Sequence, residues 1–554
     1  MRRILFSFWL MIISSVVFAE THPSYQFFGL EGVLLSNAEN AIAENEKTAK
    51  TKHINIVKVV NNSLQPYGYF RAHVSIVKNN QTVKVYVKKG EAIRFSKIDI
   101  TIEGAGRDNP ELNKFKNNFP IKVNDEFNAP KYQDAKTEFF RISNNQGYIH
   151  ANFTKTEVLI DLPHYRASMI LHLQTGERYY YGNTFFGKSP YADSFLQRFI
   201  PYHQDEPISN QRLMNLQQSM SESFYFQDVS ITPKIEQAQN RHIPIFIETS
   251  TPKSQKYAAA IGYGTFTGPR LTASANFRRL TNTGQHADLQ LRLSSIITGF
   301  TGKYYIPGSN PLEDKWFFGG NYQRFEPKGG KSTSKTIFVG FIKKWQNVTN
   351  NVSLNFLNEH YRTQTLPYTT SNSLYPSYNL AYRNVDNLIL PTKGVALNLT
   401  VQGASSQFFS TTSFLQTDLR VRGVYSPFSF ARIVAKGEFG YTVANDLYHL
   451  PLTMRFFAGG LDSIRGFADS SIGPGRYLQV ASLEYQNRVI DNWWGAIFYD
   501  TGTATNHYGS PLNTGVGVGV IYQSFIGPIR LYGAQAISKQ DKPYSFEFSI
   551  GPEF

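Results

Sequence analysis

The chain has 554 residues, which is too long for one ordinary hydrophobic core, so at least two domains are expected. Its 56 lysines and arginines outnumber its 41 aspartates and glutamates, and aromatic residues make up 15% of the sequence. No basic run is interleaved with stacking aromatics, which argues against a nucleic-acid partner and favours contact with anionic lipid head groups. Cysteine is absent, as suits a protein that crosses an oxidising compartment, although this absence alone excludes little.

The N-terminus has the pattern of a secretory signal peptide, which we assign to residues 1–19. Two arginines follow the first methionine, residues 4–17 are apolar, and the small residue Ala19 precedes a predicted cleavage site before Glu20. The apolar stretch is shorter than the roughly 20 residues of a membrane-spanning helix, so an uncleaved anchor is the less favoured alternative. The mature protein is therefore expected outside the cytoplasm.

Residues 24–250 mix helical stretches with short strands and contain a faint repeat. Gly-Tyr-Phe-Arg-Ala-His-Val at 68–74 is echoed by Gly-Tyr-Ile-His-Ala-Asn-Phe at 147–153, and a degenerate copy without the glycine covers 224–229. Glycine after a helix is the expected C-cap, because it adopts positive φ at no steric cost. A spacing of roughly 80 residues indicates tandem small domains. We predict three α/β domains, at residues 20–90, 91–176 and 177–253.

From about residue 256 to the C-terminus, apolar and polar residues alternate. One example is a run of three leucines separated by polar or charged residues: Asp288, Leu289, Gln290, Leu291, Arg292 and Leu293. A soluble sandwich also alternates, but a lysine or arginine facing mid-bilayer costs about 2–4 kcal/mol, whereas the lumen of a membrane barrel accepts it. The regular alternation of charged residues with apolar faces therefore favours a transmembrane β-barrel.

Counting runs between turn signals predicts about 16 strands, an even number that lets an antiparallel sheet close. The expected fold is thus α+β repeats followed by a 16-stranded antiparallel barrel at residues 254–554. Trp493 and Trp494 stand where a strand begins, as the residues of an aromatic girdle do.

The longest connection in this half spans about residues 444–476 and contains the motif Ile464-Arg465-Gly466-Phe467. Two acids, Glu484 and Asp500, follow in strand-like runs. An arginine with carboxylate partners suggests a loop that folds into the lumen, with Arg465 paired to both acids, because guanidinium suits bidentate carboxylate pairing in a confined space. The family resemblance given below implies the same arrangement and is the main reason to prefer it. A solvated loop arginine is the alternative.

Strand parity indicates which face each acid occupies. Glu484 shares a face with the polar residues Ser482 and Gln486, so it is expected to point inward. Asp500 shares a face with the apolar residue Phe498, and parity alone leaves its direction open.

Gly515, Gly517 and Gly519 alternate with valines near the C-terminus. A phosphate-binding loop is excluded, because the context is a strand and no helix start follows. We expect a smooth inner wall, where a loop or another backbone approaches closely.

The first and last strands of the predicted barrel are candidates for a lateral gate. The first, at about 256–267, carries small residues that pack weakly, and the last carries bulky apolar ones: Ala258, Ala260 and Gly262, then Phe546, Phe548, Ile550 and Phe554. An opened seam between them offers unpaired backbone groups to a client strand. The last strand is also expected to serve as an assembly signal, and a plain closing strand with aromatic anchors is the simpler interpretation.

Catalytic motifs are missing from the sequence. Neither Gly-x-Ser-x-Gly nor His-Glu-x-x-His occurs, the 12 histidines are scattered, and a chain without cysteine has no thiolate metal site. We therefore predict no enzymatic activity, no cofactor and no metal.

The arrangement resembles the bacterial outer-membrane assembly-factor superfamily, whose members join periplasmic POTRA domains to a sixteen-stranded barrel. The resemblance is carried by the motif at 464–467, by Phe-Tyr-Asp-Thr-Gly at 498–502 and by the terminal strand ending in Phe554. Three repeats, with the opening segment 30–37, look most like the TamA subtype, the outer-membrane subunit of the translocation and assembly module. The glycine missing near Phe224 departs from the repeat pattern and makes the third domain's boundaries less secure.

The resemblance implies insertion or translocation of client outer-membrane proteins and autotransporters, with the N-terminal domains in the periplasm. It also implies contact with outer-membrane lipids and an inner-membrane-anchored partner of the TamB type. Alternatives in the same class are a central barrel-assembly subunit, for which five repeats are expected, and a two-partner-secretion transporter, for which two are. A passive channel, or porin, is the alternative of another class, although it needs no such N-terminal domains.

Overall fold

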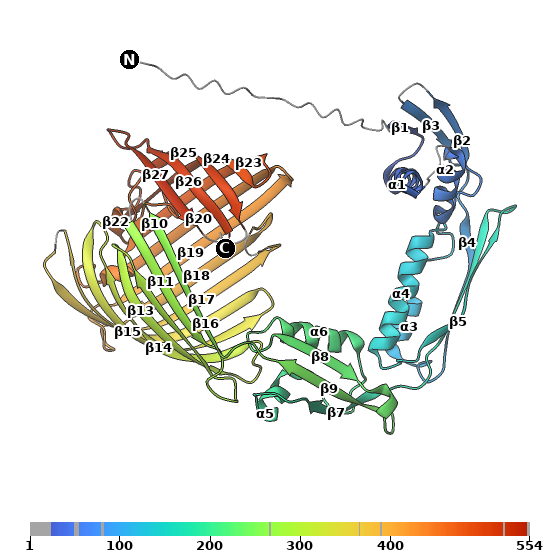
Figure 1. Cartoon of the computed structure of the whole chain (residues 1–554), viewed down its shortest axis with the longest axis horizontal. Coiled ribbons are helices and arrows are strands. Elements are labelled where there is room, and N and C mark those ends of the chain that lie inside the picture. The colour runs from blue at the N-terminus through green and yellow to red at the C-terminus, as the bar shows by residue number, and fades with distance from the viewer. Residues whose placement is uncertain are drawn as a thin grey trace, which may run out of the picture. The chain divides into compact units, whose positions relative to one another are not determined.

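The computed structural model describes residues 24–48, 55–78, 82–264, 268–364, 366–387, 390–524 and 527–550. The predicted signal peptide and Phe554 lie outside these residues. The described chain forms three small three-stranded sheets, one 16-stranded sheet and one two-stranded sheet (Figure 1). Within this described part, no helix combines the length and the hydrophobicity of a transmembrane helix.

The first small sheet contains one parallel and one antiparallel pair, and its strands in sheet order are β1 (Ser24–Phe28), β3 (Thr82–Lys88) and β2 (His73–Lys78). Its helical elements are α1 (Gly32–Thr48), α2 (Ile56–Leu64) and the 3-10 turn η1 (Gln65–Tyr67). Ile42, Val60 and Val85 are buried in its core. Gly68 caps the turn with a φ of +92°, the conformation expected from the sequence.

The second small sheet repeats this plan, with the strand order β4 (Arg94–Glu103), β6 (Arg166–Gln174) and β5 (Asn152–Asp161). Two helices accompany it, α3 (Pro110–Asn117) and α4 (Ala129–Asn145). Asn109 and Asn128 cap them, because each side chain accepts a hydrogen bond from a backbone N–H of the first turn. Phe95, Phe139 and Met169 are buried in the core between helices and sheet.

The third small sheet has the order β7 (Tyr180–Phe186), β9 (His242–Ser250) and β8 (Asp228–Pro233). The helical elements in this part of the chain are α5 (Asp193–Leu196), η2 (Gln197–Phe199), α6 (Asn210–Ser221) and η3 (Ile235–Gln237). Each small sheet lies within one of the three ranges expected from the sequence. The boundaries of those domains stay predictions.

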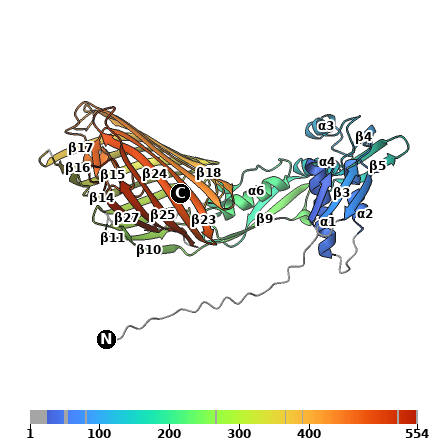
Figure 2. The same cartoon turned by 90° about the horizontal axis from the view of Figure 1, so that it is seen from above.

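The C-terminal part forms the 16-stranded sheet, in which every neighbouring pair is antiparallel. This confirms the predicted fold class, and Figure 2 shows the sheet curled into a barrel. The strands in order are β10 (Gln255–Gly264), β11 (Gly268–Phe277), β12 (His286–Leu293), β13 (Ile297–Pro307), β14 (Asp314–Phe325), β15 (Gly330–Trp345), β16 (Val348–Thr363), β17 (Thr369–Val385), β18 (Lys393–Ala404), β19 (Phe414–Phe428), β20 (Ala431–Ala444), β23 (Tyr477–Ile490), β24 (Trp493–Thr505), β25 (Asn513–Ser524), β26 (Gly527–Ala536) and β27 (Tyr544–Ile550).

The barrel strands present apolar side chains outward and polar or charged ones inward. On β23, Leu483 and Tyr485 are exposed, whereas Glu484 and Gln486 are buried. This pattern fits a wall that faces lipid on one side and a polar lumen on the other.

The expectation of two girdle tryptophans is wrong for one of them. Trp493 is 51% exposed and packs on Tyr522. Trp494 lies on the opposite face of β24, against a buried cluster that includes Phe498 and Tyr532. Consecutive residues of a strand point to opposite faces, so both cannot face lipid.

The two ends of the sheet, β10 and β27, lie beside each other (Figures 1 and 2). Among the described residues, no hydrogen-bonded ladder joins them. The described part of β27 has 7 residues, compared with 16 in β15. The barrel wall is therefore weakest along this seam.

The seam should be visible in hydrogen–deuterium exchange of the purified protein in detergent. Amides of β10 and β27 are expected to exchange at least about tenfold faster than amides of β15 and β16, because strands that lack a second partner open locally at low cost. Equally slow exchange in β27 and β15 would contradict a weak seam.

Candidate functional site

Residues 445–476 connect β20 to β23, and we call this segment loop 6. It contains the short turn η4 (Leu452–Met454) and a hairpin of β21 (Phe456–Ala458) and β22 (Ile472–Gly475). Ile464 and Phe467 are 0% and 1% exposed, and they pack in a cluster with inward-facing residues of β23 and β24. The loop therefore has its own small apolar core inside the barrel.

Arg465 is the centre of the contacts between loop 6 and the barrel wall. Its guanidinium donates from Nε to Oδ2 of Asp500 at 2.7 Å and from Nη2 to Oδ1 at 2.8 Å. Nη1 donates to Oε2 of Glu484. Nη2 also lies 3.3 Å from the Ser482 hydroxyl, and the Arg465 backbone N–H donates to Asp500 Oδ2 at 3.0 Å. One arginine thus ties loop 6 to β23 and β24.

Two aromatic rings enclose the Arg465 guanidinium. Its Cζ lies 3.5 Å from the ring centre of Phe498 and 4.7 Å from that of Tyr532, so cation–π attraction supplements the ion pairs. The Tyr532 hydroxyl and the Gln486 amide both donate to Glu484 Oε1, at 2.8 and 2.7 Å. Glu484 is therefore satisfied on both oxygens.

The three charged side chains of this arrangement are almost completely buried. The side chains of Arg465 and Asp500 are 2% and 0% exposed, and that of Glu484 is 5% exposed. A buried charge is tolerated only when it is paired and hydrogen-bonded. Removing one partner of such a desolvated set costs about 3–5 kcal/mol. We call Arg465, Glu484 and Asp500 the clamp.

The predicted glycine wall lies directly behind the clamp. A Cβ added at Gly515 would stand 1.9 Å from the carbonyl oxygen of Arg465, and one at Gly519 would stand 2.3 Å from the Tyr532 ring. At Gly517 it would meet the carbonyl of Gly533 at 2.1 Å. The missing side chains leave the space that loop 6 and the aromatic rings occupy.

Loop 6 is also held at its other end, on a different part of the wall. Glu359 of β16 is buried and accepts hydrogen bonds from the backbone N–H of Thr453, at 3.1 Å, and from its hydroxyl. Gln416 of β19 donates to the Met454 carbonyl at 2.6 Å. Loop 6 thus extends across the lumen, from β16 and β19 to β23 and β24.

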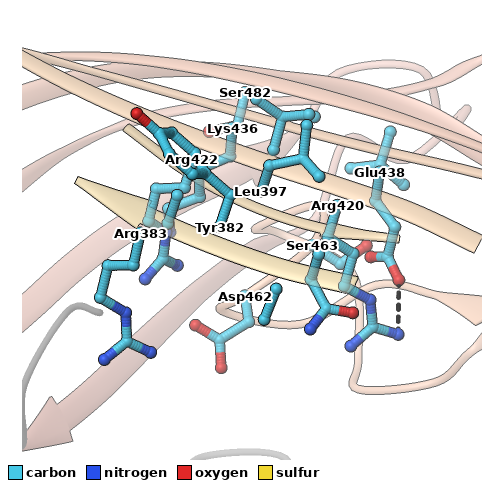
Figure 3. A pocket seen from close by; sticks show the side chains of 16 residues that line it. Tyr382, Arg383, Leu397, Arg420, Arg422, Lys436, Glu438, Asp462, Ser463 and Ser482 are labelled. Carbon is cyan, nitrogen blue, oxygen red and sulfur yellow. Dashed lines mark ion pairs between the residues drawn. The ribbon is translucent and has the colours of Figure 1, made fainter. Parts of the chain in front are cut away.

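A cavity of about 510 Å³ lies beside loop 6 in the lumen (Figure 3). Arg420 pairs with Glu438 at 2.7 Å. Asp462 belongs to loop 6 and lines this cavity together with Lys436 and Arg422 of the wall. The charged residues that line the cavity are four cations and two acids: Arg383, Arg420, Arg422, Lys436, Glu438 and Asp462. The loop therefore places a carboxylate in a cavity whose wall carries mostly cations.

Residues 276–554, half of the chain, match the Omp85 superfamily domain. The chain belongs to the Omp85 superfamily. It is accordingly a bacterial outer-membrane protein whose N-terminal POTRA-like domains lie in the periplasm. Membership supports a role in inserting or secreting proteins at that membrane.

Solved structures share the fold of this Omp85 protein at low sequence identity. BamA from Haemophilus ducreyi lacking POTRA domains 1–3 is 18% identical with a TM-score of 0.66, and the match covers 83% of this chain and 100% of that one. CdiB from Acinetobacter baumannii is 12% identical with a TM-score of 0.51, covering 94% and 99%. CdiB from Escherichia coli is 12% identical with a TM-score of 0.52, covering 93% and 96%.

The residues predicted for the gate of this Omp85 protein lie on its two edge strands. Ala258 and Ala260 of β10 stand opposite Ser274 and Thr272 of β11, and Gly262 stands opposite Arg270. On β27, the outward residues Phe546 and Ile550 are 68% and 48% exposed, and Phe548 has the same parity. The roles of these residues stay predictions.

The sequence did not reveal several residues of the site. Phe498 left the direction of Asp500 undecided, whereas in the structure its ring lies on Arg465 and both residues point inward. Glu547 of β27 accepts a hydrogen bond from loop 6. Its position in the period-two pattern of the last strand was the one available signal.

Replacing Arg465 by alanine is expected to leave the barrel assembled and to release loop 6, because the two acids lose their cation. Assembly is measured by the heat-dependent shift in gel mobility, and the position of the loop by limited proteolysis. The control Arg488→Ala, at an exposed site near the end of β23, should change neither. Wild-type resistance of loop 6 in Arg465→Ala would contradict the clamp.

Gly515→Ala is expected to displace loop 6 while Gly423→Ala is not. The first substitution places a methyl group against the Arg465 carbonyl, whereas a Cβ at Gly423 meets nothing within 4 Å. Forcing such an overlap in a packed site costs about 1–3 kcal/mol. The same proteolysis assay compares the two variants, and equal resistance of loop 6 in both would show that the close approach at Gly515 is unimportant.

Proposed function

We propose that this Omp85 protein assists the insertion or translocation of outer-membrane proteins, including autotransporters, through a lateral gate between β10 and β27. The observation that carries this proposal is the seam: two neighbouring edge strands without a ladder among the described residues. An edge strand offers a row of unpaired N–H and C=O groups, to which an incoming strand can add.

The energy of the process comes from the client. No ATP is available at the outer membrane, so folding of the client has to drive insertion, and the barrel lowers the barrier. A client strand in hydrocarbon would otherwise have unpaired backbone groups, and each unpaired group costs on the order of several kcal/mol. Pairing with β10 or β27 satisfies these groups.

The periplasmic domains supply further strand edges. In the second small sheet β5 is an edge strand of 10 residues, all of which are exposed or half-buried. Such an edge is suited to guiding an extended client by strand addition. The resemblance to the TamA subtype supports an inner-membrane-anchored partner of the TamB type, which would bind to these domains.

The clamp keeps loop 6 inside the lumen in this proposal, so that the barrel interior stays obstructed while the wall opens at the seam. The roles of Arg465, Glu484 and Asp500 then follow from their geometry. They fix the loop to β23 and β24, so that the wall would separate between β10 and β27.

A disulfide across the seam is expected to block client assembly. The chain has no cysteine, so cysteines introduced at Ala258 or Ala260 of β10 and at Ser545 or Ser549 of β27 are the only thiols present. Oxidation should reduce the assembly of autotransporter clients in depleted cells at least about tenfold, and reduction should restore it.

The matched control joins two strands that are already paired, with cysteines at Ser353 of β16 and Ser377 of β17, which stand opposite each other. This tether should leave client assembly unchanged. Full client assembly with an oxidised seam would refute the lateral gate.

A further inference from the structure

Loop 6 reaches the last strand of the barrel as well as the clamp. The backbone N–H of Gly466 donates to Oε1 of Glu547 at 2.8 Å. Glu547 lies on the inward face of β27 and is only 3% exposed. Because Gly466 follows Arg465 directly, neighbouring loop residues contact β23 and β24 on one side and β27 on the other.

The backbone around Gly466 allows this contact because the residue is a glycine. Its φ is +91°, a conformation that residues with a side chain rarely adopt. A Cβ at Gly466 would lie 3.0 Å from backbone atoms of Gln535 and Ala536 on β26. Loop 6 is therefore pressed against β26 with its N–H directed at β27.

Glu547 depends on loop 6 for its strongest hydrogen bond. The Ser545 hydroxyl lies 3.5 Å from Oε1, and Oε2 has no hydrogen-bond partner within the described structure. A buried carboxyl with an unsatisfied oxygen is costly. If loop 6 moved away, Glu547 would keep only the weak contact with Ser545, so the position of β27 is linked to that of the loop.

Loop 6 thus bridges from the clamp to the edge of the seam. Arg465 holds β23 and β24, Gly466 holds β27, and β25 and β26 lie between them in the sheet. On its other side, β27 has no ladder with β10 among the described residues. Displacing β27 outward breaks the Glu547–Gly466 bond unless the loop follows.

We propose that Glu547 is a positioning residue that couples loop 6 to the gate strand β27. Release of the loop loosens β27, and displacement of β27 loosens the loop, since coupling between two sites is reciprocal. Only the biological purpose of this coupling rests on the proposed lateral gate. The coupling itself is a property of the barrel without a client.

The test measures both ends of the coupling in the full-length protein in detergent. Cysteines are introduced at Ile261 and Phe546, which are both exposed on the outer face, and labelled with nitroxides. The distance between the labels, measured by double electron–electron resonance, reports the width of the seam. Limited proteolysis reports the release of loop 6. Glu547→Ala is expected to broaden the seam distances and to raise the proteolysis rate of the loop at least about tenfold.

Three further variants separate coupling from general damage. Glu547→Gln keeps a carbonyl oxygen for Gly466 and should resemble wild type. Ser549→Ala removes a polar group on the inward face of the same strand, whose hydroxyl has no hydrogen-bond partner within the described structure, and should also resemble wild type. Arg465→Ala should broaden the distances across the seam, although the Arg465 side chain contacts β23 and β24 and not β27. Combining Arg465→Ala with Glu547→Ala should add little further broadening, because both break one linkage.

The proposal is overturned if Glu547→Ala widens the seam without releasing loop 6, or if it has neither effect. If that variant does not assemble, the same question is answered in the otherwise unchanged chain by the oxidised β10–β27 tether, which should slow the proteolysis of loop 6. The Ser353–Ser377 tether should not, and equal rates with the two tethers overturn the coupling. No client is present, so this result stands apart from the client-assembly assay that tests the gate.

Discussion

The burial of one guanidinium constrains much of this barrel. Arg465 lies inside the lumen at 2% exposure, where a charge is tolerated only with full compensation. Two carboxylates and two aromatic rings supply that compensation from β23, β24 and β26. The bidentate bond to Asp500 fixes the orientation of the guanidinium as well as its charge, which an ammonium group would not do. Loop 6 therefore has a defined place in the lumen and does not merely fill it.

From the clamp, loop 6 spans the lumen and supports the barrel wall at more than one point. One end rests on Glu359 of β16 and the other on the clamp, so the loop connects distant parts of the wall. The glycine face of β25 provides the space for its backbone, and the contact with Glu547 extends its reach to the last strand. Among the described residues, no hydrogen-bonded ladder joins β10 to β27. Loop 6 therefore supports the wall on β16, β23, β24 and β27, whereas the seam itself has no such support. Rigidity on one side and weakness on the other are what the proposed lateral gate requires.

Much of the fold followed from the sequence, because a strand with two different environments must alternate. That constraint predicted the 16 strands and the inward face of Glu484. It left Asp500 undecided, since an apolar residue beside a lumenal acid looks like a lipid-facing residue until the ring of Phe498 is seen on the guanidinium. It misplaced Trp494 for the same reason, as an aromatic side chain fits either a girdle or a lumenal cluster. Glu547 was hidden more deeply, because its partner is a backbone N–H that no side-chain pattern reports.

The most direct measurement is the exchange of the Arg465 Nε–H proton with water, observed by NMR of the ¹⁵N-arginine-labelled protein in detergent and assigned by its loss in Arg465→Lys. A proton held between guanidinium and carboxylate in a closed lumen should exchange at least about a hundredfold more slowly than that of an exposed arginine such as Arg488. Equal exchange at the two arginines would mean that loop 6 is not anchored in the lumen, and the account of a braced wall with one weak seam would fail.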